Sequence, residues 1–210
     1  MKLYLARHGK SNAREVNKRQ SPSSPLSEEG KKQASALAKR MAKEKIDVII
    51  SSKWDRAYQT AEIVSKKLKI KLETIEGIHE KEQNPKLEGV SFESDVHKRY
   101  TEEIEKYEKN LNWKFDGEGE STRDLINRAR IFQRHLIENH KDQDVLIVSH
   151  GLFIRAFVIL ALLGEDYDDN TFYRIYTSIS TSNAGVTLLE YIPIRKHWEL
   201  VYLNDHLHIS

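Results

Sequence analysis

The sequence lacks cysteine, carries almost no net charge and contains no long apolar run. With no cysteine, the chain has no disulfide framework, thiolate zinc site, iron–sulfur cluster or cysteine nucleophile. Its 34 Lys and Arg residues against 32 Asp and Glu residues leave a formal net charge of +2. That balance provides no large basic field, so we expect no nucleic-acid partner.

Apolar stretches are all shorter than the roughly 18–20 residues that a helix needs to cross a bilayer. The nearest candidate, residues 152–163, contains Arg155 and predicts a buried helix. The first residues turn polar at Arg7, which leaves too short an apolar region for a signal peptide. We therefore expect a cytoplasmic protein with no membrane partner.

The 210 residues, 39% of them apolar, suit one domain with a sizeable core. Short apolar runs predict strands at about residues 3–6, 46–50, 72–75, 145–148, 186–192 and 198–203. Helical periodicity predicts helices at about residues 27–45, 55–68, 94–110, 122–139 and 152–163. The alternation predicts an α/β fold: a three-layer sandwich with a mostly parallel central sheet and helices on both faces.

Polar side chains follow four consecutive predicted strands. In chain order they are Arg7-His8-Gly9, then Ser51-Ser52 with Arg56, then His79-Glu80-Lys81-Glu82, and Ser149-His150-Gly151. Sites in open α/β sheets form outside the carboxyl ends of the strands, so we expect these groups to meet at one edge.

This combination of residue types predicts a phosphate site. The planar fork of arginine matches phosphate oxygens, and the helix that begins after His150 directs backbone N–H groups at the same anion. A neutral imidazole attacks phosphorus, and a carboxylic acid protonates the leaving oxygen and then activates water. No Gly-x-Gly-x-x-Gly turn or P-loop is present, which excludes a dinucleotide-binding oxidoreductase.

Five motifs occur in the order in which they occur in the histidine phosphatase superfamily, whose fold is phosphoglycerate mutase-like. They are Arg7-His8-Gly9 within residues 5–11, residues 25–34, residues 51–61 around Arg56, Gly119-Glu120-Ser121 with Arg128, and Val148-Ser149-His150-Gly151. The resemblance implies that His8 is the nucleophile that forms a phosphohistidine. It also implies a reaction that uses no metal and no other cofactor.

The resemblance implies roles for the other residues of these motifs as well. Arg7, Arg56 and His150 bind the phosphoryl group, and His150 belongs to the catalytic set. Glu80 is the general acid and base. The remaining expected substrate-binding residues are Gly9, Ser11, Asn12 and Gly151.

Two of these assignments leave alternatives open. The family commonly has a phosphate-contacting Asn where this chain has Arg14; Asn12 and Asn17 are the nearest candidates, and we favour Asn12. Glu80 and Glu82 both follow the third strand, and we favour Glu80 because it comes first.

Two segments fall outside the regular alternation and are expected to shape specificity. Residues 82–118 are polar and aromatic, and we expect them to form an excursion over the active site with one helix, within a single domain of residues 1–210. Residues 164–182 are rich in Thr, Ser and Tyr and are predicted to form a loop.

The expected function is therefore a phosphomonoester hydrolase that acts on a small-molecule phosphate ester through phospho-His8. A mutase that passes the phosphoryl group to a bound glycerate ranks lower, because residues 79–84 lack the segment that mutases carry around the acid. A module that binds a phosphorylated ligand without turnover is the third interpretation. The natural substrate stays open, as does the choice between monomer and homodimer.

Overall fold

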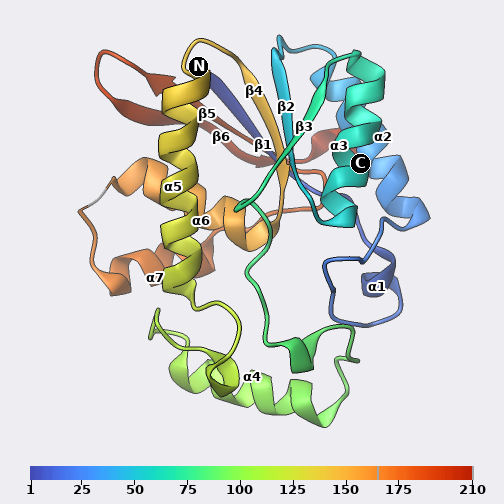
Figure 1. Ribbon diagram of the computed structural model, residues 1–210, viewed down its shortest axis with the longest axis vertical. Coiled ribbons are helices and arrows are strands. Elements are labelled where there is room, and N and C mark those ends of the chain that lie inside the picture. The colour runs from blue at the N-terminus through green and yellow to red at the C-terminus, as the bar shows by residue number, and fades with distance from the viewer. Residues whose placement is uncertain (165, 210) are drawn as a thin grey trace.

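A computed structural model of the chain describes residues 1–164 and 166–209. One six-stranded sheet runs through it in the order β3-β2-β4-β1-β5-β6 (Figure 1). The strands are β1 (Lys2–Arg7), β2 (Val48–Ser52), β3 (Leu72–Ile75), β4 (Val145–Ser149), β5 (Val186–Ile192) and β6 (His197–Asp205). Strands β1 to β4 pair in parallel, while β5 and β6 pair antiparallel, which confirms the mostly parallel sheet.

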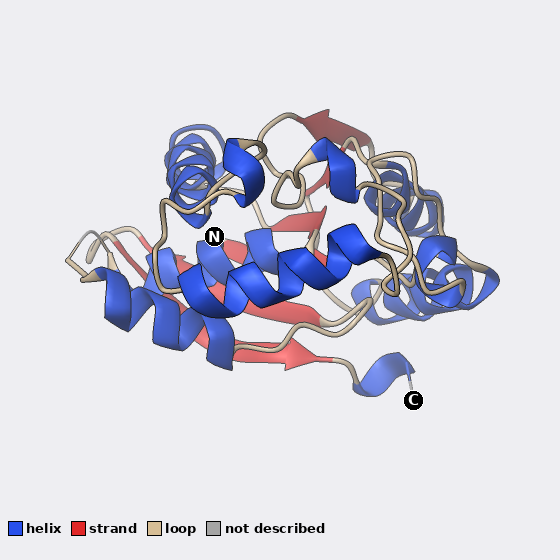
Figure 2. Ribbon diagram, turned by 90° about the horizontal axis from the view of Figure 1, so that it is seen from below, coloured by secondary structure: helices blue, strands red, loops and turns tan. Residues whose placement is uncertain are grey.

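Helices cover both faces of this sheet, as predicted (Figure 2). The longer ones are α2 (Glu28–Met41), α3 (Asp55–Leu68), α4 (Asp95–Tyr107), α5 (Thr122–His140), α6 (Gly151–Leu163) and α7 (Asp169–Ser178). The short ones are α1 (Asn12–Glu15) and the 3-10 turns η1 (Pro85–Leu87), η2 (Phe115–Gly117) and η3 (Leu207–Ile209). Among the described residues, no helix is both long and apolar enough to cross a membrane.

Alternation along the strands divides the core into two halves. In β1, Leu3 and Leu5 pack with side chains of α5, α6 and α7, whereas Tyr4 and Ala6 pack with α2 and α3. All five residues of β4 are buried because this strand lies in the middle of the sheet. Helix α6 is buried on most of its surface, which explains why its sequence is apolar throughout.

Side-chain caps mark the starts of α2 and α5, two of the predicted helices. Ser27 accepts a hydrogen bond from the backbone N–H of Gly30 at the start of α2. Ser121 and Asp124 form a reciprocal capping box at the start of α5. The expected helix 27–45 ends earlier, at Met41, where the last buried position of its apolar face is reached.

The prediction of a loop over residues 164–182 is wrong, because α7 occupies most of that segment. Asp168 caps α7 by accepting a hydrogen bond from the N–H of Thr171. Phe172 and Tyr176, four residues apart, are buried on one face, while most of the Thr and Ser content lies on the exposed face. The many polar residues of this segment suggested a loop, although Phe172 and Tyr176 have the spacing of one helix face.

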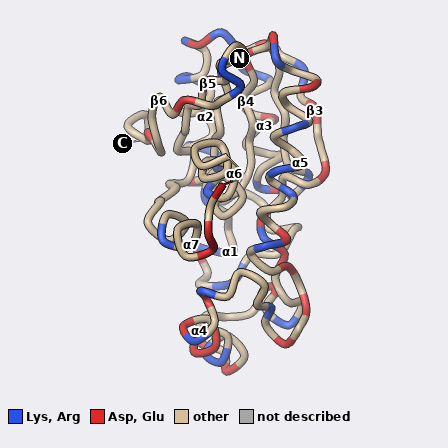
Figure 3. Tube along the Cα trace, turned by 90° about the vertical axis from the view of Figure 1, so that its left-hand side faces the viewer, with Lys and Arg blue, Asp and Glu red and all other residues tan. Residues whose placement is uncertain are grey.

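Residues 82–118, here called the cap segment, lie beyond the lower end of the sheet in Figure 1, with α4 at the bottom of the molecule. They contain α4 where one helix was expected, together with η1 and η2. Lys and Arg alternate with Asp and Glu along α4 (Figure 3), and no residue of this helix is fully buried. The segment is held to the body partly by arginine side chains over aromatic rings: Arg14 lies over Phe92, and Arg19 over Tyr100.

Two glycines allow the loop after β1 to pack against the first turn of α2. A Cβ added to Gly9 would lie 2.5 Å from the carbonyl oxygen of Gly30, and one added to Gly30 would lie 2.0 Å from that of Lys10. Both obstructing atoms belong to the backbone, so neither contact is relieved by rotating a side chain. The neighbour that excludes a Cβ at Gly9 is therefore the first turn of α2.

Replacing Gly30 with Ala should destabilise the protein by about 1–3 kcal/mol, because the backbone must separate to admit the methyl group. Lys32→Ala, on the exposed face of the same helix, should change stability by less than about 0.5 kcal/mol. Urea unfolding of both variants measures the difference. Equal midpoints for the two would contradict the proposed close contact.

Candidate active site

The carboxyl ends of β1, β4 and β2 bring the predicted groups together. Strands β1 and β4 pair in a register that sets Arg7 opposite Ser149, so His8 and His150 leave the sheet side by side. Strand β2 pairs with the other edge of β4 and leads through Trp54 into α3, where Arg56 lies in the first turn. The expected convergence of these residues at one sheet edge is what the structure shows.

The two imidazoles lie in contact beneath the surface. Their ring centroids are 5.1 Å apart, and both residues are 0% exposed. Two hydrogen bonds fix the backbone of His8. Its N–H donates to the carbonyl of Ser149, and its carbonyl accepts from the side-chain amide of Asn183. Asn183 is a positioning residue that no sequence motif indicated.

The hydrogen bonds of His8 select one tautomer. Its Nδ1 lies 2.7 Å from the carbonyl oxygen of Gly9, which can only accept, and Nε of Arg56 donates to its Nε2 at 3.1 Å. The neutral ring therefore carries its proton on Nδ1 and a lone pair on Nε2. Burial, then the charges of Arg56 and Arg7, lower the pKa of His8 well below its ordinary value, so the ring is neutral at physiological pH.

Arg56 and Arg7 supply positive charge beside this lone pair. Arg56 is 1% exposed, donates through Nη1 to the carbonyl of Ser21 at 2.9 Å and lies over the ring of Trp54. Burial lowers its pKa to about 10, which still leaves it charged at neutral pH. Arg7 donates through Nη1 to the carbonyl of Thr181 at 2.6 Å, and its buried Nε makes no hydrogen bond within the described part of the chain.

His150 is held as firmly as His8. Its Nε2 lies 3.0 Å from Oγ of Ser52, and the ring of Trp54 meets it edge-on at 5.2 Å between centroids. Its Nδ1 is buried and has no hydrogen-bond partner among the described residues. Burial and the charge of Arg56 lower the pKa of His150 well below its ordinary value, so this ring is neutral as well.

Glu80 and Glu82 differ sharply in their surroundings. The Glu80 carboxylate accepts from the N–H of Leu152 at 3.0 Å, at the first turn of α6, directly beside Gly151. The Glu82 side chain is 56% exposed and pairs with His79 at 3.1 Å. The geometry therefore favours Glu80 as the acid.

Arg128 fixes the loop that carries Glu80. Its guanidinium donates to the carbonyls of Gly77, His79 and Glu80, and it forms a two-pronged pair with Glu120 at 2.7 Å. The resemblance pointed to this segment but not to its task, which is to hold the backbone of the acid.

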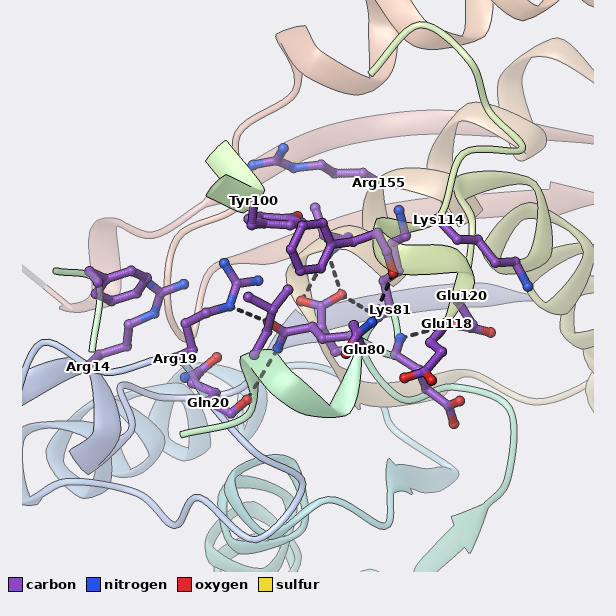
Figure 4. Close-up of a pocket in the computed structure, with 18 of the residues that line it drawn as sticks. Arg14, Arg19, Gln20, Glu80, Lys81, Tyr100, Lys114, Glu118, Glu120 and Arg155 are labelled. Atoms are coloured by element: carbon purple, nitrogen blue, oxygen red, sulfur yellow. Dashed lines mark hydrogen bonds between the residues drawn. The ribbon is translucent and has the colours of Figure 1, made fainter. Parts of the chain in front are cut away.

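A cavity of about 260 Å³ lies between the carboxyl ends of the strands and the cap segment (Figure 4). Arg7, Arg56, Glu80 and Gly151 line it, while the two histidines lie fully buried. Groups from the cap segment complete its outer wall: Phe92, Tyr100, Trp113, Lys114 and Phe115. Within the described residues, no cluster of three or more His, Cys, Asp or Glu side chains has the arrangement of a metal site.

Three expected contacts, Gly9, Ser11 and Asn12, are not among the residues that line this cavity. Asn12 begins α1 and is exposed, and Asn17 is also exposed, so neither lines the cavity; Arg14 does, at the position that the family resemblance assigned to Asn. Ser11 is buried, but its Oγ accepts from the side chain of Gln20, which lines the cavity in its place. Asn12, the preferred candidate, is therefore exposed on α1 and does not line the cavity.

No sequence motif indicated Arg19, Gln20 or Arg155 as cavity residues, and Thr181 was expected only as part of residues 164–182. Arg155 lies one turn beyond Gly151 on α6, so its helical spacing from the second-histidine motif could have indicated it. Thr181 and Arg19 lie in irregular segments, where sequence periodicity carries no signal.

Comparison with known proteins agrees with this geometry. Residues 3–206 match the family described as "Histidine phosphatase superfamily (branch 1)". The chain belongs to the histidine phosphatase superfamily. The family resemblance read from its motifs is thus confirmed, and with it the prediction of a histidine-type phosphatase. Phosphoserine phosphatase 1 of Hydrogenobacter thermophilus is 36% identical over 169 residues, which cover 79% of this chain and 78% of that protein.

Solved structures of this superfamily share the fold. A mycobacterial glucosyl-3-phosphoglycerate phosphatase in complex with VO3 superposes with a TM-score of 0.81 at 23% identity, covering 97% of this chain and 99% of its own. A phosphoserine phosphatase from Entamoeba histolytica in complex with 3-phosphoglyceric acid gives a TM-score of 0.77 at 22% identity, covering 100% of this chain and 99% of its own.

The two buried neutral imidazoles make stability depend on pH. Below about pH 6.5 the unfolded chain binds protons that these rings do not bind in the folded state, so the stability present above that pH is lost as the pH falls. We expect His150→Gln to reduce the slope of unfolding free energy against pH between 5 and 6.5 by up to about 1.4 kcal/mol per pH unit.

Urea unfolding at several pH values measures this slope. His206→Gln, at an exposed histidine near the chain end, is the matched control and should keep the slope of the unsubstituted protein. An unchanged slope in the His150 variant would mean that this ring takes up a proton in the folded state.

Proposed function

We propose that the protein hydrolyses phosphate monoesters of small molecules through a phosphohistidine on His8, within a single domain that spans residues 1–210. The observation that carries this proposal is the His8 ring: Nδ1–H is bound to the Gly9 carbonyl, and the Nε2 lone pair faces the Arg56 guanidinium. A phosphate dianion fits this arrangement, because it draws the Arg56 N–H groups to its own oxygens and releases the lone pair for attack.

In the first step Nε2 of His8 attacks phosphorus as the bond from phosphorus to the leaving oxygen breaks. Arg7 and Arg56 neutralise the charge on the equatorial oxygens, and the neutral ring of His150 is available to donate a hydrogen bond to one of them through Nδ1, which has no partner among the described residues. Glu80, in its protonated form, gives its proton to the departing alkoxide, so the alcohol leaves neutral. The Gly9 carbonyl stabilises the positive charge that the phosphorylated ring acquires.

In the second step water attacks the phosphoryl group and the bond from phosphorus to Nε2 breaks. Glu80, now a carboxylate, takes the proton from this water, which returns both residues to their starting states. The hydrogen bond from Leu152 at the first turn of α6 keeps the carboxylate aligned in both steps. The pair formed by Arg128 and Glu120 holds the backbone beneath it.

The proposal predicts that His8→Ala lowers kcat by more than about 1,000-fold on every ester that the protein hydrolyses. Vanadate should still bind to the variant within about tenfold of its affinity for the unsubstituted protein, because the arginines remain. Rapid quenching of the unsubstituted protein with labelled substrate should trap an acid-labile phosphohistidine. Binding with no hydrolysis by the unsubstituted protein over a broad panel would favour a non-catalytic module instead.

The two candidate acids are separated by substitution of each. Glu80→Gln should lower kcat on alkyl phosphates by about 100- to 10,000-fold. The loss should be smaller on p-nitrophenyl phosphate, whose leaving group needs no proton. Glu82→Gln, a matched change on an exposed side chain, should alter kcat by no more than a few-fold. The opposite pattern would transfer the role to Glu82.

A further inference from the structure

The cavity contains more positive charge than one phosphoryl group requires. Seven cationic residues line it: Arg7, Arg14, Arg19, Arg56, Arg155, Lys81 and Lys114. Four acids line it: Glu80, Glu82, Glu118 and Glu120. One of these acids, Glu120, is paired with a cation outside the cavity lining, Arg128.

The cavity arginines form no ion pair with a described acid, although the nearby charge of Glu80 partly opposes the lowering of the pKa of Arg7 and Arg56 by burial. Lys114 pairs with Asp124 at 2.9 Å, but in residues 1–164 and 166–209 none of the five cavity arginines has a carboxylate oxygen within 4.0 Å. The transferring phosphoryl group accounts for Arg7 and Arg56. Arg14 stands where the family resemblance places another phosphate contact. Arg19 and Arg155 remain to be explained.

Arg155 forms part of the cavity wall. It projects from α6, one turn beyond the second-histidine motif, and its Nε is buried without a hydrogen bond to any described residue. Its charge lies close enough to Arg7 to add to burial in lowering the pKa of that residue. Arg155 itself is half-buried, and two guanidinium groups held close together in one cavity attract an anionic ligand to it.

Arg19, in the segment between α1 and α2, is also held in place by several contacts. Its Nε donates to the side-chain oxygen of Gln83 at 2.5 Å, its Nη1 lies 3.2 Å from Nδ1 of His97, and the guanidinium covers the ring of Tyr100 at 4.6 Å. Figure 4 shows the Arg155 and Arg19 side chains above and below Tyr100. The two arginines thus belong to the part of the cavity that the cap segment covers.

We propose that Arg155, assisted by Arg19, binds a carboxylate on the leaving group, so that the preferred substrates are phosphate esters of small hydroxy acids. This inference rests on the proposed hydrolysis of phosphate esters. The planar fork of Arg155 matches a carboxylate, and the extra negative charge complements what remains of the cavity charge after the phosphate has bound. A cavity of about 260 Å³ limits the class to small molecules.

The test compares substrates that differ in one charge only. O-phosphoserine and 3-phosphoglycerate are assayed beside their methyl esters, with p-nitrophenyl phosphate as a general ester. For at least one pair, kcat/KM of the unsubstituted protein should be about 10- to 100-fold higher for the acid than for its methyl ester, mainly through KM.

Substitutions then assign the preference to a residue. Arg155→Gln should bring the acid-to-ester ratio close to one, and Arg155→Lys, which keeps the charge, should restore part of it. Arg174→Gln, at an exposed arginine on α7 away from the cavity lining, should leave the ratio unchanged. If the Gln variant does not fold, the unsubstituted protein still decides: the acid should inhibit hydrolysis of p-nitrophenyl phosphate at least tenfold more strongly than its methyl ester.

The outcomes separate the two proposals. Hydrolysis of acids and methyl esters with equal kcat/KM, and equal inhibition by both, would overturn the carboxylate site and leave the hydrolase intact. A preference for the acid over its methyl ester that persists in Arg155→Gln would show that Arg155 does not bind the carboxylate. Hydrolysis of no ester at all, by a folded protein, would overturn the proposed function and the substrate class with it.

Discussion

The parallel pairing of β1 with β4 is the constraint on which the site depends. That register sets the last residue of one strand, Arg7, opposite the last residue of the other, Ser149, so the next residue of each chain segment is a histidine at the same depth. Neither ring needs a flexible loop to reach the other. Because β4 is buried along its whole length, the pairing is held by the core rather than by the site.

Burial at this point controls the chemistry. Two neutral imidazoles and two charged guanidiniums share a region from which water is largely excluded, and each group is shifted toward its uncharged form. A bound anion reverses the balance, because it offers acceptors to donors that have no partner in the protein, such as Nε of Arg7. Under the proposed function, the free energy spent in burying these cations is recovered when a phosphate binds, which favours the phosphate over water.

The cap segment adds selectivity to a site whose core is set by the sheet. Its aromatic rings and the arginines that lie over them form the outer wall of the cavity, at a distance from the buried histidines. Under the proposed function, we expect changes in this segment to alter which leaving group fits without disturbing the strand ends.

The sequence by itself determined the sheet and most helices, because buried strands and helix caps are local signals. Short motifs at the strand ends also predicted that four residues come together there: His8, His150, Arg7 and Arg56. Only the tertiary structure decided what depends on contacts between distant segments. It placed Asn12 outward, put Arg155 and Arg19 in the cavity, and set Glu80 rather than Glu82 at α6. It also folded residues 169–178 into a helix, since the value of burying Phe172 arises only when α6 is there to receive it.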